Sequence, residues 1–128
     1  MTEAREITVR MVPVGKARPR VVNGHAYTPD TTRSAEGLIA ATWLEKYGMR
    51  RMAADVPLKM TIEVQLVRPK RSTREWPTVR PDVDNYAKLA LDALNRIAYA
   101  DDAQIVELHC RKVYGEEPCL IIRLEELK

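Results

Sequence analysis

The chain has 128 residues, of which 45% are hydrophobic, and its formal net charge of +3 corresponds to a pI near 9.0. This length suits one compact domain over residues 1–128, and no apolar run approaches the roughly 20 residues that span a bilayer. The first residues, 1–6, lack the order of a signal peptide, so we expect a cytoplasmic protein with no membrane contact.

The first expected elements are a strand and a basic loop. Apolar and polar residues alternate over 7–11, which is the period of a half-buried strand. Segment 15–29 is rich in Gly, Pro and basic residues, and its Asn23-Gly24 pair predicts a small β-ribbon. Arginine and lysine side chains suit phosphate oxygens, so we expect this loop to bind nucleic acid through Lys16, Arg18 and Arg20.

A helix and a strand are expected next. Thr31 or Thr32 can cap a helix, and Glu36 suits a capping box, which predicts a helix over about 32–47. Residues 58–68 show the clearest alternation of apolar and polar side chains in the chain. This alternation predicts a strand with one buried face.

The segment 69–77 is polar, basic and bounded by prolines, so we expect a loop that is mobile when no ligand is bound. Trp76 in this loop has two open interpretations: it stacks on an unpaired base, or it anchors the loop to the domain. The loop and the residues after it form a second basic patch, for which we also expect contact with nucleic acid: Lys70, Arg71, Arg74 and Arg80.

The last expected elements are a helix over about 84–97 and two strands over about 104–113 and 119–126 that form a hairpin. The fold class is therefore predicted as α+β, a small mixed sheet with two main helices, in the order β, β-ribbon, α, β, α, β, β. Cys110 and Cys119 fall out of register in such a hairpin, so no disulfide is expected.

Charge is divided unevenly along the chain. Residues 1–80 contain 15 Lys and Arg against 8 Asp and Glu, whereas residues 81–128 contain 6 against 10. A basic part that faces an anion and an acidic part that holds a metal ion would explain this division, although solvated surface charge is an equally good explanation of net charge alone.

The acidic part begins at Asp82 and Asp84. Pro81 favours extended chain at Arg80, and Asp84 suits the N-cap of the following helix, so both carboxylates can face one point. Taken alone, Asp84 is explained by helix capping. Lys88 lies one turn further along the same helix face, with Asp92 and Asn95 beyond it, for which a solvated surface is the simpler explanation.

A second acidic pair, Asp101-Asp102, follows the helix. Adjacent residues of extended chain point to opposite sides, so one of the two is expected to reach a metal ion; a simple turn is the alternative. Several carboxylates close together repel one another unless a cation is present, and oxygen ligands suit Mg²⁺. Lys88 either stabilises charge on a phosphate or pairs with Asp84 as an ordinary helix ion pair.

Four motifs together resemble the RusA family of Holliday junction resolvases: segments 15–20 with 27–29, 80–88, 91–94 and 101–104. The resemblance implies a small mixed α/β homodimer with two Mg²⁺-dependent sites, Mn²⁺ being a substitute, that nick a four-way junction symmetrically. It transfers the essential aspartates to Asp82, Asp84 and Asp102, with Asp101 adjacent, and the catalytic lysine to Lys88.

The sequence therefore predicts a metal-dependent endodeoxyribonuclease of DNA recombination and repair that binds branched DNA and needs no small-molecule cofactor. The expected metal ligands are Asp82, Asp84 and Asp102, with Asp101 as the alternative to Asp102. A non-catalytic, structure-selective DNA-binding protein is the second hypothesis; clustered acids facing phosphate disfavour it. A nucleotide-sugar transferase using Asp-x-Asp is the third, disfavoured by the small size of the chain.

Overall fold

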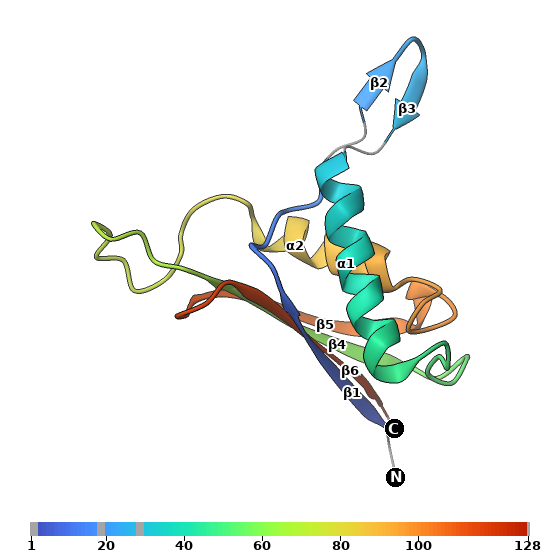
Figure 1. Ribbon diagram of the computed structural model, residues 1–128. Helices are drawn as coiled ribbons and strands as arrows, with labels where there is room; N and C mark the ends of the chain where they lie inside the picture. Colours follow the sequence, from blue (N-terminus) through green and yellow to red (C-terminus); the bar gives the residue numbers. More distant parts are fainter. Residues whose placement is uncertain (1–2, 18–19, 28–29, 128) are drawn as a thin grey trace.

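Two helices cover one face of a four-stranded mixed sheet (Figure 1). The computed structural model describes residues 3–17, 20–27 and 30–127. Helix α1 spans Asp30–Tyr47 and helix α2 spans Val83–Leu94. A separate ribbon of two short strands, β2 (Arg20–Val22) and β3 (His25–Tyr27), projects from the N-terminal end of α1 (Figure 1). The predicted α+β class and the predicted element order are confirmed.

The order of strands in the sheet is β1 (Ala4–Arg10), β6 (Cys119–Glu126), β4 (Leu58–Leu66) and β5 (Ile105–Tyr114). Strands β4 and β5 are parallel, because helix α2 connects them as a crossover. Strand β6 is antiparallel to both of its neighbours. The sheet therefore has two edges, β1 and β5.

The predicted hairpin of the last two strands is wrong, because β4 lies between β5 and β6. Burial explains the arrangement. Alternate residues of β6 are fully buried, and a strand of this kind is favoured in the middle of a sheet: Leu120, Ile122 and Leu124. Strand β5 is mostly exposed and occupies an edge. Cys110 and Cys119 are consequently separated by β4, and both are free thiols.

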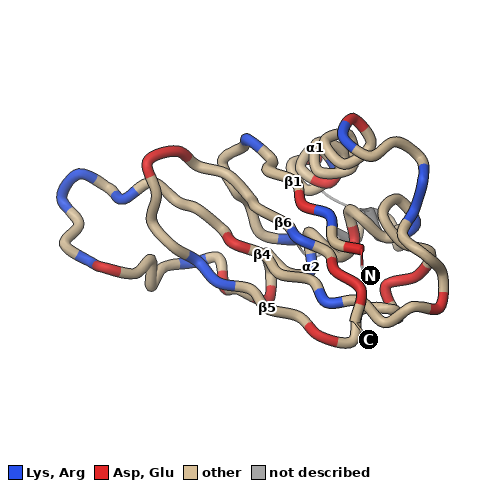
Figure 2. Tube along the Cα trace, turned by 90° about the horizontal axis from the view of Figure 1, so that it is seen from below, with Lys and Arg blue, Asp and Glu red and all other residues tan. Residues whose placement is uncertain are grey.

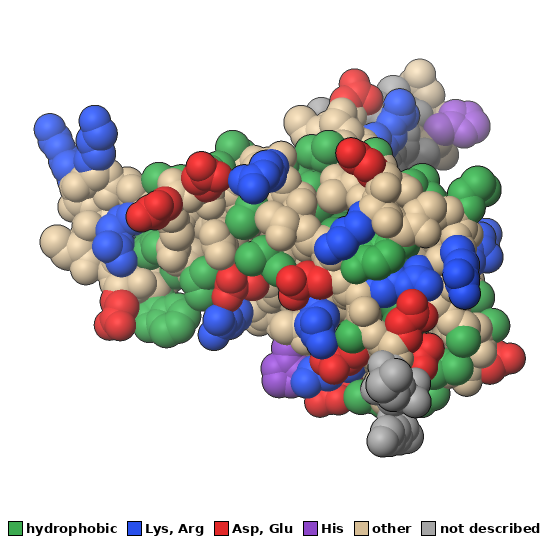
Figure 3. All heavy atoms as spheres, turned by 60° about the horizontal axis from the view of Figure 1, so that its bottom comes forward, with side chains coloured by type: hydrophobic (Ala, Val, Ile, Leu, Met, Phe, Trp, Pro, Cys, Tyr) green, Lys and Arg blue, Asp and Glu red, His purple; other side chains and the backbone are tan. Residues whose placement is uncertain are grey.

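The core lies between the helices and one face of the sheet. Alternate residues of β4 and one face of α2 are buried there, among them Ile62, Val64, Tyr86 and Leu89. The other face of the sheet is polar and carries ion pairs such as that between Arg111 Nη2 and Glu63 Oε1 at 2.6 Å. Figure 3, turned so that the underside of Figure 1 comes forward, shows acidic and basic side chains interspersed there.

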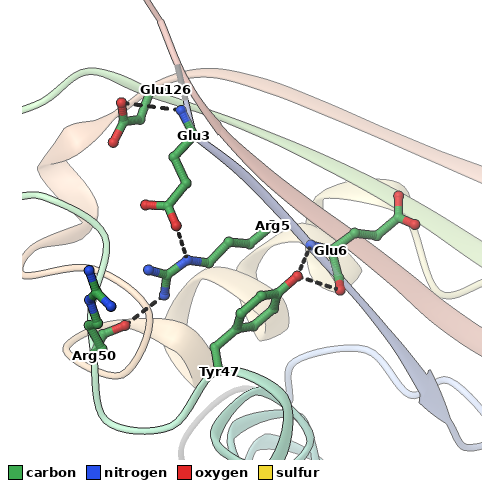
Figure 4. A network of polar contacts seen from close by, with 6 residues as sticks. All are labelled: Glu3, Arg5, Glu6, Tyr47, Arg50 and Glu126. Atoms are coloured by element: carbon green, nitrogen blue, oxygen red, sulfur yellow. Dashed lines mark hydrogen bonds and ion pairs between the residues drawn. The ribbon is translucent and has the colours of Figure 1, made fainter. Parts of the chain in front are cut away.

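Polar contacts fix the C-terminal end of α1 to β1 (Figure 4). The Tyr47 hydroxyl accepts a hydrogen bond from the Glu6 amide at 2.8 Å and contacts the Glu6 carbonyl oxygen. Arg5 is buried, and its guanidinium donates to Glu3 Oε2 at 2.7 Å and to the Arg50 carbonyl at 2.6 Å. A buried charge needs such partners, so this arginine holds the helix end against the sheet.

Helix α2 is shorter at its C-terminal end than the sequence predicts. Asn95 leaves the helix with extended dihedral angles, and Arg96 has a positive φ of 67°. The chain therefore turns before Ile97, which the apolar periodicity had assigned to the helix. This early turn brings the segment after α2 back along the helix, which places the second acidic pair.

Candidate active site

Asp82 stands at the start of α2. It has extended backbone angles (φ −73°, ψ 158°), and its carbonyl oxygen accepts the first helical hydrogen bond, from the Asn85 amide at 3.1 Å. The N-cap is therefore Asp82, two residues before the predicted Asp84, while the expected extended conformation at Asp82 is confirmed. Its carboxylate makes no capping hydrogen bond, so helix capping does not explain the acid at this position.

Helix α2 carries Asp84, Lys88 and Asp92 at intervals of four residues, which places them along one face. Asp84 and Lys88 are exposed, and no ion pair joins them within 4.0 Å. The alternative explanation of Lys88 as the partner of Asp84 therefore finds no support. The charge of Lys88 instead acts on Asp102, where it opposes a rise in the pKa of that carboxyl.

The two adjacent acids that follow α2 have different surroundings. Asp101 caps a short 3₁₀ turn, η1 (Asp102–Gln104): its Oδ1 accepts a hydrogen bond from the Ala103 amide at 3.0 Å. Gln104 Oε1 accepts from the Asp101 amide at 3.3 Å and completes a capping box. The hydrogen bond from Ala103, followed by the contact with Asp102, lowers the pKa of Asp101. The turn interpretation thus fits Asp101.

Asp102 faces helix α2. Its amide donates to Asn95 Oδ1 at 3.0 Å, which links η1 to the C-terminal end of the helix. Asp102 is exposed, and a small loss of solvation, then the hydrogen bond with Asp101 and the charges of Asp101 and Asp92, raise its pKa. Because the Asp101 carboxylate already caps the turn, Asp102 remains the predicted metal ligand of the pair, and this assignment stays a prediction.

Lys16 lies between two helices. Its Nζ is 3.1 Å from Glu36 Oε2 on α1 and 3.2 Å from Asp92 Oδ2 on α2. Burial alone would lower the pKa of Lys16, but the hydrogen bonds and charges of the two carboxylates outweigh it and raise that pKa. The predicted contact of Lys16 with nucleic acid stays a prediction, and the ammonium already has two partners within the fold.

The segment around Gly15 packs closely on the start of α2. A Cβ atom at Gly15 would lie 2.8 Å from Pro81 Cβ and 3.2 Å from Asn85 Cβ. The Lys16 amide donates to the Asn85 carbonyl at 3.0 Å. From the other side, Lys112 Nζ of β5 donates to the carbonyls of Val79 and Pro81, at 2.5 and 3.0 Å. The residues before and after Asp82 are therefore fixed by the Gly15 segment and by β5.

The fit of a metal ion depends on how the carboxylates are grouped. Within residues 3–17, 20–27 and 30–127, no three His, Cys, Asp or Glu side chains are grouped so that they could hold a metal ion. Mg²⁺, however, usually keeps several waters and is held by one or two carboxylates together with substrate phosphates. The acids along α2 are donors of that kind, so the residues present fit Mg²⁺. The assignment of Asp82, Asp84 and Asp102 as ligands stays a prediction.

The remaining predicted contacts to nucleic acid lie mostly on one loop. Figure 2 shows Lys and Arg on the loop at the left of the view. Four exposed basic side chains follow β4 in the chain: Lys70, Arg71, Arg74 and Arg80. Arg74 donates to the Thr78 carbonyl at 3.3 Å and so also shapes the loop. Trp76 is 53% exposed, which argues against its role as an anchor of the loop. Arg20 begins β2, and Arg18 lies outside the described residues.

Sequence reasoning gave little weight to Asp92 and Asn95, which it explained as solvated helix surface. The structure makes Asp92 a partner of Lys16 and Asn95 a partner of Asp102. Sequence reasoning also missed Lys112, because the apolar pattern of strand β5 does not distinguish this lysine from any other. The spacing of Asp92 and Asn95 from Lys88 was a usable signal, because residues four and seven apart share a helix face.

Comparison with known proteins gives three findings. The family model described as "Endodeoxyribonuclease RusA" matches residues 10–125. The protein YqaN of Bacillus subtilis (strain 168) is 30% identical over 136 aligned positions, which cover 95% of this chain and 96% of that protein. The crossover junction endodeoxyribonuclease rusA of Lactococcus phage r1t is 35% identical over 75 positions, 57% of either chain.

None of the described helices is long and apolar enough to cross a membrane.

Proposed function

Because this chain belongs to the RusA family of endodeoxyribonucleases, we propose that it cuts four-way DNA junctions by paired, symmetric nicks and so serves DNA recombination and repair. Two symmetric cuts require two sites at a fixed separation, and the described part of the chain carries one acidic face along α2. The working unit in this proposal is therefore a homodimer.

The observation that carries the proposal is a row of acids with one lysine along one face of α2. Asp82 enters the helix without capping it, Asp84 and Lys88 follow on successive turns, and η1 brings Asp102 back towards Lys88. A protein that only binds phosphate backbones gains nothing from such acids, because they repel phosphate. An enzyme that needs a cation at the phosphate gains from each of them.

Mg²⁺ is the proposed cofactor, with Mn²⁺ as a substitute, and Asp82, Asp84 and Asp102 would hold it. Such an ion, when bound, supplies a more acidic water and positive charge at the scissile phosphate. The residues of the chain would orient the DNA and neutralise its negative charge. Lys88 is exposed, its charge acts on Asp102, and it would place a positive charge near a bound phosphate. The exposed basic side chains of 70–80 hold the DNA backbone by charge-assisted hydrogen bonds.

A second candidate, a junction-binding protein that does not cut, is favoured by one observation: no three-donor group is present in the described residues. One experiment decides between the two. A labelled four-way junction and a linear duplex of the same sequence are incubated with the pure protein, with and without Mg²⁺ or Mn²⁺.

We expect paired nicks at symmetric positions of the junction, only with a divalent ion, and little cutting of the duplex. Tight binding of the junction without nicks in either ion would support the second candidate. Equal cutting of junction and duplex would contradict selectivity for branched DNA.

A further inference from the structure

A cavity of about 670 Å³ lies beside the start of α2. The segment after β1, the end of β4 and the segment before α2 contribute its walls, with Val12, Pro13, Leu66, Val67, Val79 and Pro81 among the lining residues. A volume of this size is typical of sites that take a small organic group. None of the residues to which the proposed function assigns a metal ion lines it.

The walls of the cavity are mainly apolar. Val12, Val67 and Val79 are 71%, 53% and 45% exposed, although valine is ordinarily among the most buried residues. Two aromatic rings, Tyr86 and Tyr114, also line the cavity. Tyr86 is buried, so its ring closes the floor of the cavity. An apolar cavity that is open to water suits a flat organic ring, because the ring would cover apolar surface.

The rim of the cavity is positively charged. Arg74 and Arg80 line it, and the guanidinium of Arg68 lies over the Tyr114 ring at 4.9 Å. Segment 68–80 contains five Lys and Arg against one acid, Glu75. A ligand with a flat apolar part and an anion on either side complements this arrangement, and a nucleotide within a DNA strand has that chemistry.

The cavity and the acidic face share one segment of chain. Pro81 lines the cavity, and the next residue is Asp82. Lys112 holds the carbonyls of Val79 and Pro81, so the cavity wall and the helix start are fixed together. A base within the cavity would therefore lie close to a phosphate at the proposed metal site.

We propose that this cavity accepts one unstacked nucleobase of the DNA strand, next to the phosphate that is cut. The inference rests on the proposed function and adds to it a site that reads or holds a base. Unstacking is least costly where the duplex is already interrupted, as at the branch point of a junction. The cavity thus contributes to the selection of branched DNA and to the sequence at which the strand is cut.

The test uses four-way junctions with 2-aminopurine, a base that fluoresces when it is unstacked, at each position near the cut, with Ca²⁺ in place of Mg²⁺. We expect wild-type protein to raise the fluorescence several-fold at one position. Val79→Trp, which fills the cavity, should abolish the rise, while Val106→Trp, at an exposed valine of β5, should retain it. If Val79→Trp is unstable, Val12→Trp fills the cavity from the opposite wall.

A second measurement does not depend on fluorescence. Filling the cavity should weaken binding of the intact junction about tenfold, because the apolar contact of one base is lost. It should have no effect on a junction with an abasic site at that position. Either of two results would overturn the proposal: no fluorescence change at any position with wild-type protein, or equal losses on intact and abasic junctions. A change of mass in light scattering with Val79→Trp would instead assign the cavity to contact between copies.

Failure of the proposed function is distinguishable from failure of the cavity proposal. Nicking with Mg²⁺ is measured in the same preparations. Wild-type protein that neither binds nor nicks the junction contradicts the proposed function. Wild-type protein that nicks it normally without unstacking a base contradicts only the cavity proposal.

Discussion

The two basic loops of this protein look alike in sequence and differ in the structure. Lys16 of the first loop lies between Glu36 and Asp92, with 14% of its side chain exposed. Lys70 and Arg71 of the second loop are exposed, and neither forms an ion pair with another described residue. The comparison shows that basic side chains of similar segments have different surroundings, and we expect those surroundings to decide which of them bind phosphate.

The largest effect that separates the two loops concerns stability. Lys16→Met leaves two partly buried carboxylates without their cation, so we expect the free energy of unfolding to fall by about 1–3 kcal/mol. Lys70→Met, an exposed matched control, should change it by less than about 0.5 kcal/mol. Urea denaturation measures both. Equal effects of the two substitutions would remove the distinction.

A glycine substitution tests how closely the first loop packs on the start of α2. Gly15→Ala places a methyl group 2.8 Å from Pro81 Cβ, so the segment must shift, and we expect a loss of about 1–3 kcal/mol together with slower nicking. Gly37→Ala is the control, because no atom lies within 4 Å of its Cβ; as a helix-interior position it should gain about 0.5–1 kcal/mol. A neutral Gly15→Ala would contradict the packing.

Salt dependence measures phosphate contacts directly. The double substitution Lys70→Met with Arg71→Met should lower junction affinity and reduce the slope of log affinity against log salt by about one for each phosphate contact that is lost. Lys16→Met should leave that slope unchanged. Gel shifts at several salt concentrations provide the measurement, and a reduced slope for Lys16→Met would return this lysine to the DNA-binding set.

The smallest effect is a pH dependence of the Lys16 cluster. The pKa of Lys16 is raised above its ordinary 10.5, since the two carboxylates outweigh burial. A raised pKa contributes its full stability below the unfolded value and loses it as pH rises through the folded value. From neutral pH the difference in unfolding free energy between wild type and Lys16→Met should therefore stay constant up to about pH 10 and shrink above it. A difference that grows above about pH 10 would contradict this sign.

Local patterns predicted most of the elements, and contacts between distant segments explain the rest. Strand β6 was predicted at its observed bounds, and the acids of α2 were placed on one helix face, because both follow from periodicity. The predicted hairpin of the last two strands was wrong, because the order of strands depends on which strand pairs with a neighbour on both sides. The pairing of Lys16 with Asp92 joins segments 76 residues apart and leaves no local signal.

The sequence predicted which elements carry the acids of the proposed site, but not the local geometry of those acids. The Asp-x-Asp spacing located the start of α2, and the structure moved the N-cap from Asp84 to Asp82. The different surroundings of Asp101 and Asp102 needed the geometry of η1, in which the Asp101 carboxylate caps the turn and the Asp102 amide donates to Asn95; which of the two binds a metal ion stays a prediction. Adjacent residues of equal type cannot be distinguished by sequence when a turn orients them.

The central claim is that the acidic face of α2 cuts DNA while other residues hold it. Its most direct test compares Asp82→Asn with Asp55→Asn, a control at an exposed aspartate whose positive φ of 62° asparagine tolerates. Gel-shift affinity and nicking of a four-way junction with Mg²⁺ are measured on the same samples. We predict that Asp82→Asn loses nicking and keeps or tightens binding, because an anion near phosphate is removed, while Asp55→Asn behaves as wild type. Full nicking by Asp82→Asn would contradict the account.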